Sequence, residues 1–184
     1  MIAGSIPRRY AKALLSIGIE KQSYEKLGAE IAAFASLLVE HAALRDTLEN
    51  PSYSHSKRKA IVLALLDRLQ PSPSVRSFLL LLCDRNRLEY MTAIVREYQG
   101  LADEHAGRVR AGVVSAEALD SEAVLRLKKA LEQKTGKQVL LEQSTDPELI
   151  AGMVTKVGSI VYDGSLRTRL EQMKSVLIEG QPGQ

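Results

Sequence analysis

Cysteine and aromatic residues are scarce in this sequence. Its 184 residues include one cysteine, Cys83, no tryptophan and an aromatic fraction of 4%. A disulfide within the chain is therefore impossible, and a single cysteine is typical of a protein in a reducing compartment. Cys83 lies in the apolar segment FLLLLCDRNRL, and burial in apolar surroundings makes a thiol unreactive. Although Arg85 and Arg87 would favour the thiolate, we expect Cys83 to lie in a core or line a groove rather than act as a nucleophile.

Motifs for metal binding and for catalysis are also missing. The three histidines, His41, His55 and His105, are far apart, and no HxH, HExxH or CxxC pattern occurs. The chain has no GxxxxGK[ST] or GxGxxG phosphate loop and no GxSxG nucleophile elbow. These absences argue against an enzyme, and we expect no catalytic residues, no resident metal and no cofactor.

Long apolar runs and a large charge excess are absent as well. The apolar stretch from Phe78 to Cys83 is far shorter than the ~18 residues of a membrane-spanning helix, and no other stretch approaches that length. The start of the chain lacks the layout of a cleaved secretory signal, so we expect a soluble protein that reaches a membrane only through a partner. Residues 1–105 hold 14 basic and 12 acidic residues and residues 106–184 hold 11 and 10, giving the net charge of +3. A nucleic-acid-binding protein concentrates basic charge on one face, so direct nucleic-acid binding is not expected.

What the first hundred residues do have is the hydrophobic period of α-helices. Six segments show apolar residues every three or four positions, with stripes that begin at Ile6, Tyr24, Leu44, Ile61, Val75 and Leu88. Ser72 is a candidate N-cap, and Pro73 suits the first helical position that follows it. Because the connections are short, neighbouring helices should pack antiparallel, and we predict a six-helix bundle over residues 1–105.

The period changes near residue 106. Residues 108–114 alternate polar and apolar side chains, which is typical of a half-buried strand. A helix should follow, capped by Asp120 and ended by Gly136, and then a second strand over 137–144. Residues 151–162 suit two short strands joined by a type II′ turn at Gly158-Ser159, and a last helix holds Leu166, Leu170, Met173 and Leu177. We therefore predict an α+β protein with a small α/β C-terminal domain over 106–184 that contains a short sheet and a hairpin.

The fifth predicted helix is apolar nearly all round. A helix in a small bundle normally has one apolar stripe, and here that stripe is Phe78, Leu79 and Leu82. Leu80 and Leu81 are predicted to point away from it. Either this helix is central in the bundle, or one of its sides is left for an apolar partner such as an amphipathic helix. The residues alone leave both possibilities open.

Two segments carry a resemblance to a known family. The first is RRYAKALLSIG near the N-terminus, and the more specific one is DPELIAGMVTKVGSIVYDGSLRTRLEQMK, residues 146–174. Together with the helical first domain, they resemble the delta subunit of bacterial F-type ATP synthase, the family of the mitochondrial oligomycin-sensitivity-conferring protein. The family's pattern of turns and helix residues is filled by Asp146, Pro147, Gly152, Met153, Val154, Gly158, Asp163, Ser165, Arg167, Arg169 and Leu170. Ala151 stands where the family often has glycine. An alanine at this position requires only that its φ be negative.

The resemblance implies a non-catalytic stator subunit that links the catalytic hexamer to the b-subunit stalk and resists rotor torque. The N-terminal domain would bind an amphipathic helix from the N-terminus of the alpha subunit, in a groove between its first and fifth helices. Carried over to this chain, the groove residues are Tyr10, Leu14, Ile17, Leu80, Leu81, Leu82 and Arg85. The C-terminal domain would bind the C-terminal end of the b-subunit stalk through Val161, Tyr162, Leu166, Leu170 and Met173. One copy would serve each complex, at the cytoplasmic face of the bacterial inner membrane.

Alternatives stay open for both groups of residues. Tyr10, Leu14 and Ile17 fit equally well as plain bundle core, and Leu166, Leu170 and Met173 fit as core facing the sheet. A different function is also conceivable from the residues, namely a helical adaptor for another protein or for nucleic acid. That alternative requires a basic stripe, which the near-even charge distribution does not favour.

Overall fold

The computed structural model describes residues 5–50, 52–146, 149, 152–158 and 160–163. The chain divides into two compact units, an N-terminal unit Met1–Ala102 and a C-terminal unit Asp103–Gln184, and each is described by itself. Among the described helices, none is by itself long and apolar enough to cross a membrane. The second and third helices together have that length and composition, but they are bent by 103° where they meet.

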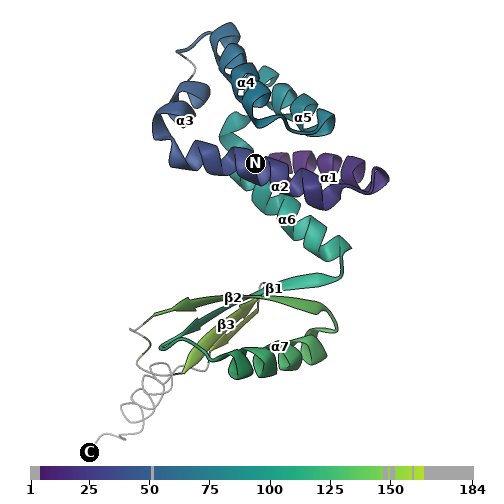
Figure 1. Cartoon of the computed structure of the whole chain (residues 1–184), viewed down its shortest axis with the longest axis vertical. Helices are drawn as coiled ribbons and strands as arrows, with labels where there is room; N and C mark the ends of the chain where they lie inside the picture. Colours follow the sequence, from purple (N-terminus) through teal and green to yellow (C-terminus); the bar gives the residue numbers. More distant parts are fainter. Residues whose placement is uncertain (1–4, 51, 147–148, 150–151, 159, 164–184) are drawn as a thin grey trace, which may run out of the picture. The chain divides into compact units, whose positions relative to one another are not determined.

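The N-terminal unit is built from helices (Figure 1). They are α1 (Ser5–Glu20), α2 (Tyr24–Glu40), α3 (Ala42–Glu49), α4 (His55–Leu69), α5 (Pro73–Asp84), the short 3-10 helix η1 (Leu88–Tyr90) and α6 (Met91–His105), whose last three residues belong to the C-terminal unit. The six α-helices occupy the six segments predicted from the hydrophobic period. Proline at the start of α5 confirms the predicted first turn, and Ser54 caps α4 by accepting a hydrogen bond from Lys57 N at 3.4 Å.

The core of this unit is one continuous cluster of buried side chains, and all six α-helices contribute to it. Its members include Leu14, Leu27, Ile31, Phe34, Leu38, Leu48, Leu66, Val75, Leu79, Leu82, Ile94 and Tyr98. Tyr98 is its largest fully buried member. The Tyr98 hydroxyl donates a 2.7 Å hydrogen bond to the carbonyl oxygen of Tyr24, so its polar end is satisfied inside the core. Gly28 leaves room for that ring, because a Cβ on Gly28 would lie 2.9 Å from Tyr98 Cε1.

Ser72 occupies the predicted N-cap position of α5, but its side chain makes no capping hydrogen bond. Instead the Glu30 carboxylate on α2 accepts hydrogen bonds from Ser72 N at 2.9 Å and from Ser72 Oγ at 2.6 Å. A charge-assisted pair of this kind is stronger than a neutral cap. The start of α5 is therefore held to α2 by a residue 42 positions earlier in the chain.

Over its described residues, the C-terminal unit is a four-stranded mixed sheet with α7 packed on it (Figure 1). Its elements are β1 (Arg108–Ser115), α7 (Ser121–Thr135), β2 (Gln138–Thr145), β3 (Met153–Val157) and β4 (Ile160–Asp163), in the sheet order β2-β1-β3-β4. β1 and β2 are parallel and are connected through α7, whereas the pairs β1–β3 and β3–β4 are antiparallel. The predicted order of strand, helix, strand and hairpin is thus confirmed, and so is the α+β fold class.

Local signals explain where these elements start and stop. Asp120 caps α7 by accepting a 2.6 Å hydrogen bond from Ala123 N, and Gly136 ends it with φ +66. Val157 pairs with Ile160, so the hairpin turn has two central residues. Gly158, the first of them, has φ +59. Type I′ and type II′ turns both require a positive φ at this position. The predicted last helix lies outside the described residues.

Alternation along the strands places the core of this unit. Ala111 on β1, Val139 on β2 and Val157 on β3 are buried against Leu131 of α7, with Val109, Leu127 and Leu141 around them. Cross-strand partners point to the same face of a sheet, and the register pairs Ala111 with Val157 and Val109 with Val139. One face of the sheet therefore packs on α7.

A candidate partner-binding groove

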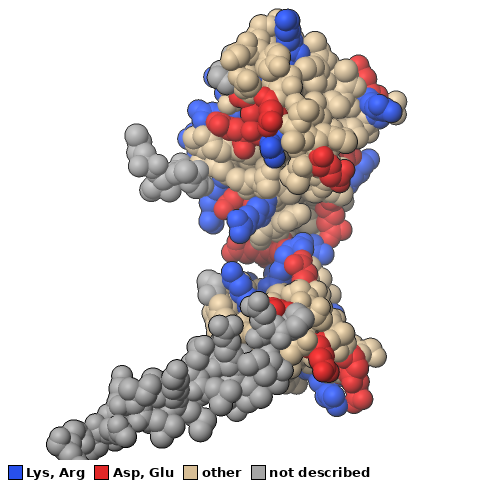
Figure 2. Space-filling model, turned by 90° about the vertical axis from the view of Figure 1, so that its left-hand side faces the viewer, with Lys and Arg blue, Asp and Glu red and all other residues tan. Residues whose placement is uncertain are grey.

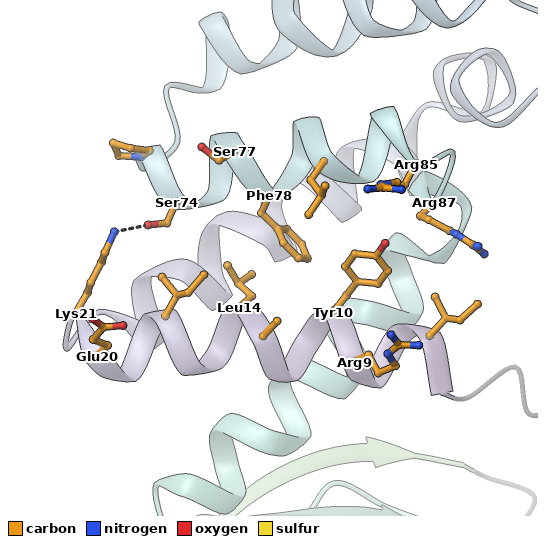
Figure 3. Close-up of a pocket in the computed structure, with 15 residues that line it drawn as sticks. Arg9, Tyr10, Leu14, Glu20, Lys21, Ser74, Ser77, Phe78, Arg85 and Arg87 are labelled. Carbon is orange, nitrogen blue, oxygen red and sulfur yellow. Dashed lines mark hydrogen bonds between the residues drawn. The ribbon is translucent and has the colours of Figure 1, made fainter.

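A long groove lies between α1 and α5 in the N-terminal unit (Figure 3). Its lining begins with Ile6 on one side and ends beyond α5 at Arg87, and it encloses about 1260 Å³. The two helices run in opposite directions along it: Lys21 and Ser74 meet at one end, and Arg9, Arg85 and Arg87 gather at the other. From Ile6 to Lys21 the groove follows α1 for ~22 Å at 1.5 Å per residue. That length suits about four turns of a helix.

The floor of the groove is apolar. Tyr10 and Phe78 face each other across it with ring centroids 6.2 Å apart and planes at 71°, an edge-to-face contact. Leu14 is fully buried beneath them. Leu81 of α5 and Ile17 of α1 remain 45% and 39% exposed, although both are large apolar side chains. Exposed apolar side chains along one continuous groove indicate a surface for a partner rather than for water.

The two ends of the groove differ in charge. Lys21 Nζ donates a 3.0 Å hydrogen bond to Ser74 Oγ and thereby bridges from the end of α1 to the start of α5, beside Glu20. At the opposite end, the three guanidinium groups of Arg9, Arg85 and Arg87 line the groove. Within the described part of the chain, none of the three forms an ion pair. Four cations and one carboxylate give the lining a net charge of +3.

The turn that ends α5 positions two of these arginines. Arg85 and Arg87 flank Asn86, which has φ +54, a left-handed conformation that asparagine adopts more readily than most residues. The turn is closed by hydrogen bonds from Asn86 N to Cys83 O at 3.1 Å and from Arg87 N to Leu82 O at 2.8 Å. The Arg87 guanidinium lies 5.7 Å from the centre of the Tyr90 ring, a cation–π contact.

The side of α5 away from the groove is occupied by α4. Asp84 accepts a 2.8 Å hydrogen bond from Lys59 Nζ, and His55 Nε2 lies 3.3 Å from the same carboxylate. The Lys59 hydrogen bond is the main cause that lowers the pKa of Asp84. Cys83 is buried in the core, and burial raises the pKa of its thiol. The predicted core position of Cys83 is thus confirmed, and its thiol is suited to packing rather than to nucleophilic chemistry.

The structure brings five of the seven predicted groove residues together: Tyr10, Leu14, Ile17, Leu81 and Arg85 all line the groove. Leu80 and Leu82 are not part of the lining. Leu82 is fully buried in the core, and Leu80 packs against that core. The reason is the phase of α5, where Phe78, Leu81 and Arg85 follow each other at three and four residues and share the groove face.

Apart from Arg85, sequence reasoning missed the polar part of the lining. Arg9, Lys21, Ser74, Ser77 and Arg87 were not among the predicted groove residues. Arg9 stands three residues after Ile6 and four before Ala13, so helical spacing along α1 could have found it. No comparable signal exists for Arg87, because its position depends on the turn after α5.

The residues predicted to bind the stalk are described only in part. Val161 lies on β4 and is 55% exposed. Tyr162 also belongs to β4, but its side chain lies outside the described residues. Leu166, Leu170 and Met173 lie outside them altogether. The assignment of these five residues stays a prediction.

Basic and acidic side chains are scattered among uncharged ones over the N-terminal unit on the face seen in Figure 2. Among the described residues, no group of three or more His, Cys, Asp or Glu side chains is arranged to hold a metal ion. The groove itself offers hydroxyl, guanidinium and apolar groups, which can bind a helix by burial and charge.

The chain matches known proteins along nearly its whole length. The family model described as "ATP synthase delta (OSCP) subunit" matches residues 6–177. The chain is 48% identical over 179 residues to the ATP synthase subunit delta of Anaeromyxobacter sp. (strain Fw109-5), covering 96% of this chain and 99% of that one. It is 40% identical to the ATP synthase subunit delta of Myxococcus xanthus over 179 residues, covering 96% and 98%.

A similar fold is found in a solved structure. A chain in the cryo-EM structure of the Toxoplasma gondii mitochondrial ATP synthase hexamer matches with a TM-score of 0.71 at 20% identity, over 97% of this chain and 99% of that one. At this identity the likeness concerns the fold, and the family rests on the sequence matches. These do not favour the alternative of an adaptor for nucleic acid or another partner. The chain belongs to the ATP synthase delta (OSCP) subunit family and is a non-catalytic, peripheral-stalk subunit of an F-type ATP synthase.

Proposed function

We propose that the groove between α1 and α5 binds an amphipathic helix at the N-terminus of the alpha subunit, and that the C-terminal unit binds the C-terminal end of the b-subunit stalk. One copy would then link the catalytic hexamer to the stalk at the cytoplasmic face of the bacterial inner membrane. It would reach the membrane only through the complex and would resist the torque of the rotor. The observation that carries the proposal is the groove's apolar floor, with Leu81 and Ile17 left exposed on facing helices.

Energetics support a helix as the occupant. The volume of about 1260 Å³ exceeds the roughly 300–1,000 Å³ of ordinary small-molecule pockets. An amphipathic helix lays residues at i, i+3, i+4 and i+7 into such a groove. Each large apolar side chain that it buries contributes about 1.5–3 kcal/mol before the cost of association. Buried apolar anchors chiefly slow dissociation, which is what a joint under torque requires.

The test is a binding titration of the full chain with a synthetic peptide from the N-terminus of the alpha subunit. Leu81→Asp replaces an exposed apolar side chain of the groove with a carboxylate and should weaken binding by at least ~100-fold, because an apolar contact is lost and the carboxylate is desolvated beneath the bound helix. Leu69→Asp is a matched control, since Leu69 is also exposed, at 41%, and also lies in the last turn of its helix. Circular dichroism should report the same helix content for both variants.

Equal binding by the Leu81→Asp variant and the parent chain would contradict the proposed groove. Loss of binding in both variants would instead indicate a general effect of a carboxylate near a helix C-terminus. The proposal is supported if the Leu81→Asp variant loses peptide affinity and the Leu69→Asp variant keeps it.

The stalk contact needs a separate measurement. Val161→Asp changes an exposed apolar residue of β4, and Val39→Asp makes the same change on α2, where Val39 is 61% exposed. We expect the first variant to reduce co-purification of the b subunit with the chain and the second to leave it unchanged. Retention of the b subunit by the Val161→Asp variant would remove Val161 from the proposed contact.

A further inference from the structure

One end of the groove has an excess of positive charge that the described residues around it do not offset. Arg9, Arg85 and Arg87 lie at this end, and none of them forms an ion pair with another described residue. The first turn of α1 has no acidic residue, although acidic side chains are favourable at a helix N-terminus. The acidic residue of α1, Glu20, lies at the opposite end of the groove. The carboxylate beside Arg85, that of Asp84, is already hydrogen-bonded to a lysine of α4.

Aromatic contacts hold several hydrogen-bond donors in place at this end. The Arg87 guanidinium lies 5.7 Å from the centre of the Tyr90 ring, and this cation–π contact restricts the side chain. The ring of Tyr10 is fixed by its edge-to-face contact with Phe78. Its hydroxyl points toward the end of α5 where Arg85 lies (Figure 3), and it has no hydrogen-bond partner among the described residues. An anion that enters here would therefore meet donors that are already oriented.

We propose that Arg9, Arg85 and Arg87, together with the hydroxyl of Tyr10, bind a phosphoryl group, such as that of inorganic phosphate or the diphosphate of a nucleotide. Each guanidinium offers five N–H donors in a planar fork that matches the oxygens of a phosphate. A carboxylate has two oxygens, which a single fork can satisfy. A diphosphate has enough oxygens for three forks, and its negative charges would offset those of the three guanidinium groups.

The test uses the isotope-labelled full chain without any peptide. Pyrophosphate is titrated at constant ionic strength, so that general screening does not change, and the side-chain and amide signals of the arginines are followed by NMR. We expect saturable shifts at Arg9, Arg85 and Arg87 and none at Lys21, which lies at the other end of the groove. Sulfate is the comparison anion, and it should bind at least ~5-fold more weakly because it carries fewer oxygens and less charge.

Neighbouring arginines supply matched variants. Arg9→Gln removes a guanidinium that lines the groove, whereas Arg8→Gln removes the adjacent one, which is exposed and outside the lining. Both variants lose the same charge, so a difference between them reports the site. We expect pyrophosphate affinity to fall roughly fivefold or more for Arg9→Gln and for Arg85→Gln, and less than ~2-fold for Arg8→Gln. Tyr10→Phe keeps the ring and should lower affinity by about 2–5-fold, through loss of one donor.

Two further titrations distinguish the sources of the phosphoryl group. The chain belongs to a subunit family of ATP synthase, and inorganic phosphate and ADP are the reactants of ATP synthesis. Similar affinities for pyrophosphate and ADP would show that the site binds the phosphoryl groups alone. An affinity for ADP at least ~10-fold higher would assign the nucleotide as the ligand. Inorganic phosphate should bind more weakly than either, because it reaches fewer of the donors.

The outcomes that would overturn the anion site are separate from those that concern the partner helix. Shifts that do not saturate, equal affinities for sulfate and pyrophosphate, or equal losses in the Arg8→Gln and Arg9→Gln variants would reduce the site to general charge attraction. None of these results involves the peptide, so the proposed function of the groove would stand. That function is tested by Leu81→Asp alone.

Discussion

The N-terminal and C-terminal units bury their side chains in different ways. In the first, one cluster of aliphatic and aromatic residues joins all six α-helices, and its polar groups are few. In the described part of the second, the buried cluster is Ala111, Leu131, Val139 and Val157. There a charged group stands beside the sheet: Arg110 Nε donates to Asp103 Oδ2 at 2.6 Å, and Arg110 Nη1 to Glu142 Oε1 at 2.9 Å.

This difference determines which side chains each unit can leave exposed without loss of stability. A complete helical core needs no contribution from Leu81 or Ile17, so these side chains can remain exposed without loss of the fold. A small sheet core depends more on its hydrogen-bonded ladder and on charge pairs such as Asp103–Arg110. We expect the first unit to respond most to changes in volume and the second to changes in charge.

The largest effect is expected from Phe34→Ala, which empties a fully buried position in the helical core. It should lower the free energy of unfolding by about 3–5 kcal/mol, through lost apolar burial and the cavity that remains. Urea denaturation followed by circular dichroism measures this, with Val39→Ala on the same helix as a control expected within about 0.5 kcal/mol. Similar losses in both variants would mean that this core does not carry the unit.

The charge dependence of the C-terminal unit can be tested on two partners of one arginine. The side chain of Asp103 is 9% exposed and that of Glu142 is 66% exposed. Asp103→Asn keeps the shape and removes the charge, and should cost about 1–3 kcal/mol of unfolding free energy. Glu142→Gln should cost less than about 1 kcal/mol, as exposed ion pairs do.

The hydrogen bond from Arg110 to Asp103 is also the main cause that raises the pKa of the Arg110 guanidinium. Equal costs of the two substitutions in urea denaturation would show that burial of Asp103 does not matter, and the contrast between the units would then be weaker than described.

Two helical glycines allow a test of how tightly the first unit is packed around Tyr98. A Cβ on Gly28 would lie 2.9 Å from the Tyr98 ring, whereas a Cβ on Gly100 would have no atom within 4 Å. Gly28→Ala should therefore destabilise the chain by about 1–3 kcal/mol. Gly100→Ala should stabilise it by about 0.5–1 kcal/mol, because alanine loses less entropy in a helix. Thermal unfolding distinguishes the two, and shifts of the same sign would contradict the packing around Tyr98.

The smallest effect concerns the polar end of the helical core. Tyr98→Phe removes the hydrogen bond to the Tyr24 carbonyl and should cost about 0.5–1.5 kcal/mol at neutral pH. Burial, and next the nearby Tyr24, raises the pKa of Tyr98 from 10.0 to about 12. The folded state thus favours the neutral phenol, so this contribution is present below pH 10 and is lost as the pH rises toward 12. In the Tyr98→Phe variant, unfolding free energy should fall less steeply over that range.

The fold was predictable from the sequence because its signals are local. Helical and strand periods located the helices and strands, Asp120 and Gly136 marked α7, and Gly158 marked the hairpin. The groove was predictable only in part. In α5 the residues from Phe78 to Leu82 are all apolar, so the sequence contains no contrast from which to find the side that faces α1. That side is decided by packing of α5 against α4 and α2, which turns Leu82 into the core and leaves Leu81 in the groove.

The conformation of Asn86 is a further feature that the hydrophobic period could not predict. Its left-handed conformation ends α5 and separates Arg85 from Arg87 by a single residue. A β-branched residue there would resist positive φ and shift the turn, whereas glycine would accept the same conformation. A substitution at this uncharged residue would therefore move the guanidinium groups of Arg85 and Arg87 without changing the net charge of the chain. In relatives with the same arginines, a β-branched residue in this turn would therefore place the charges of the groove differently, whereas glycine would keep them in place.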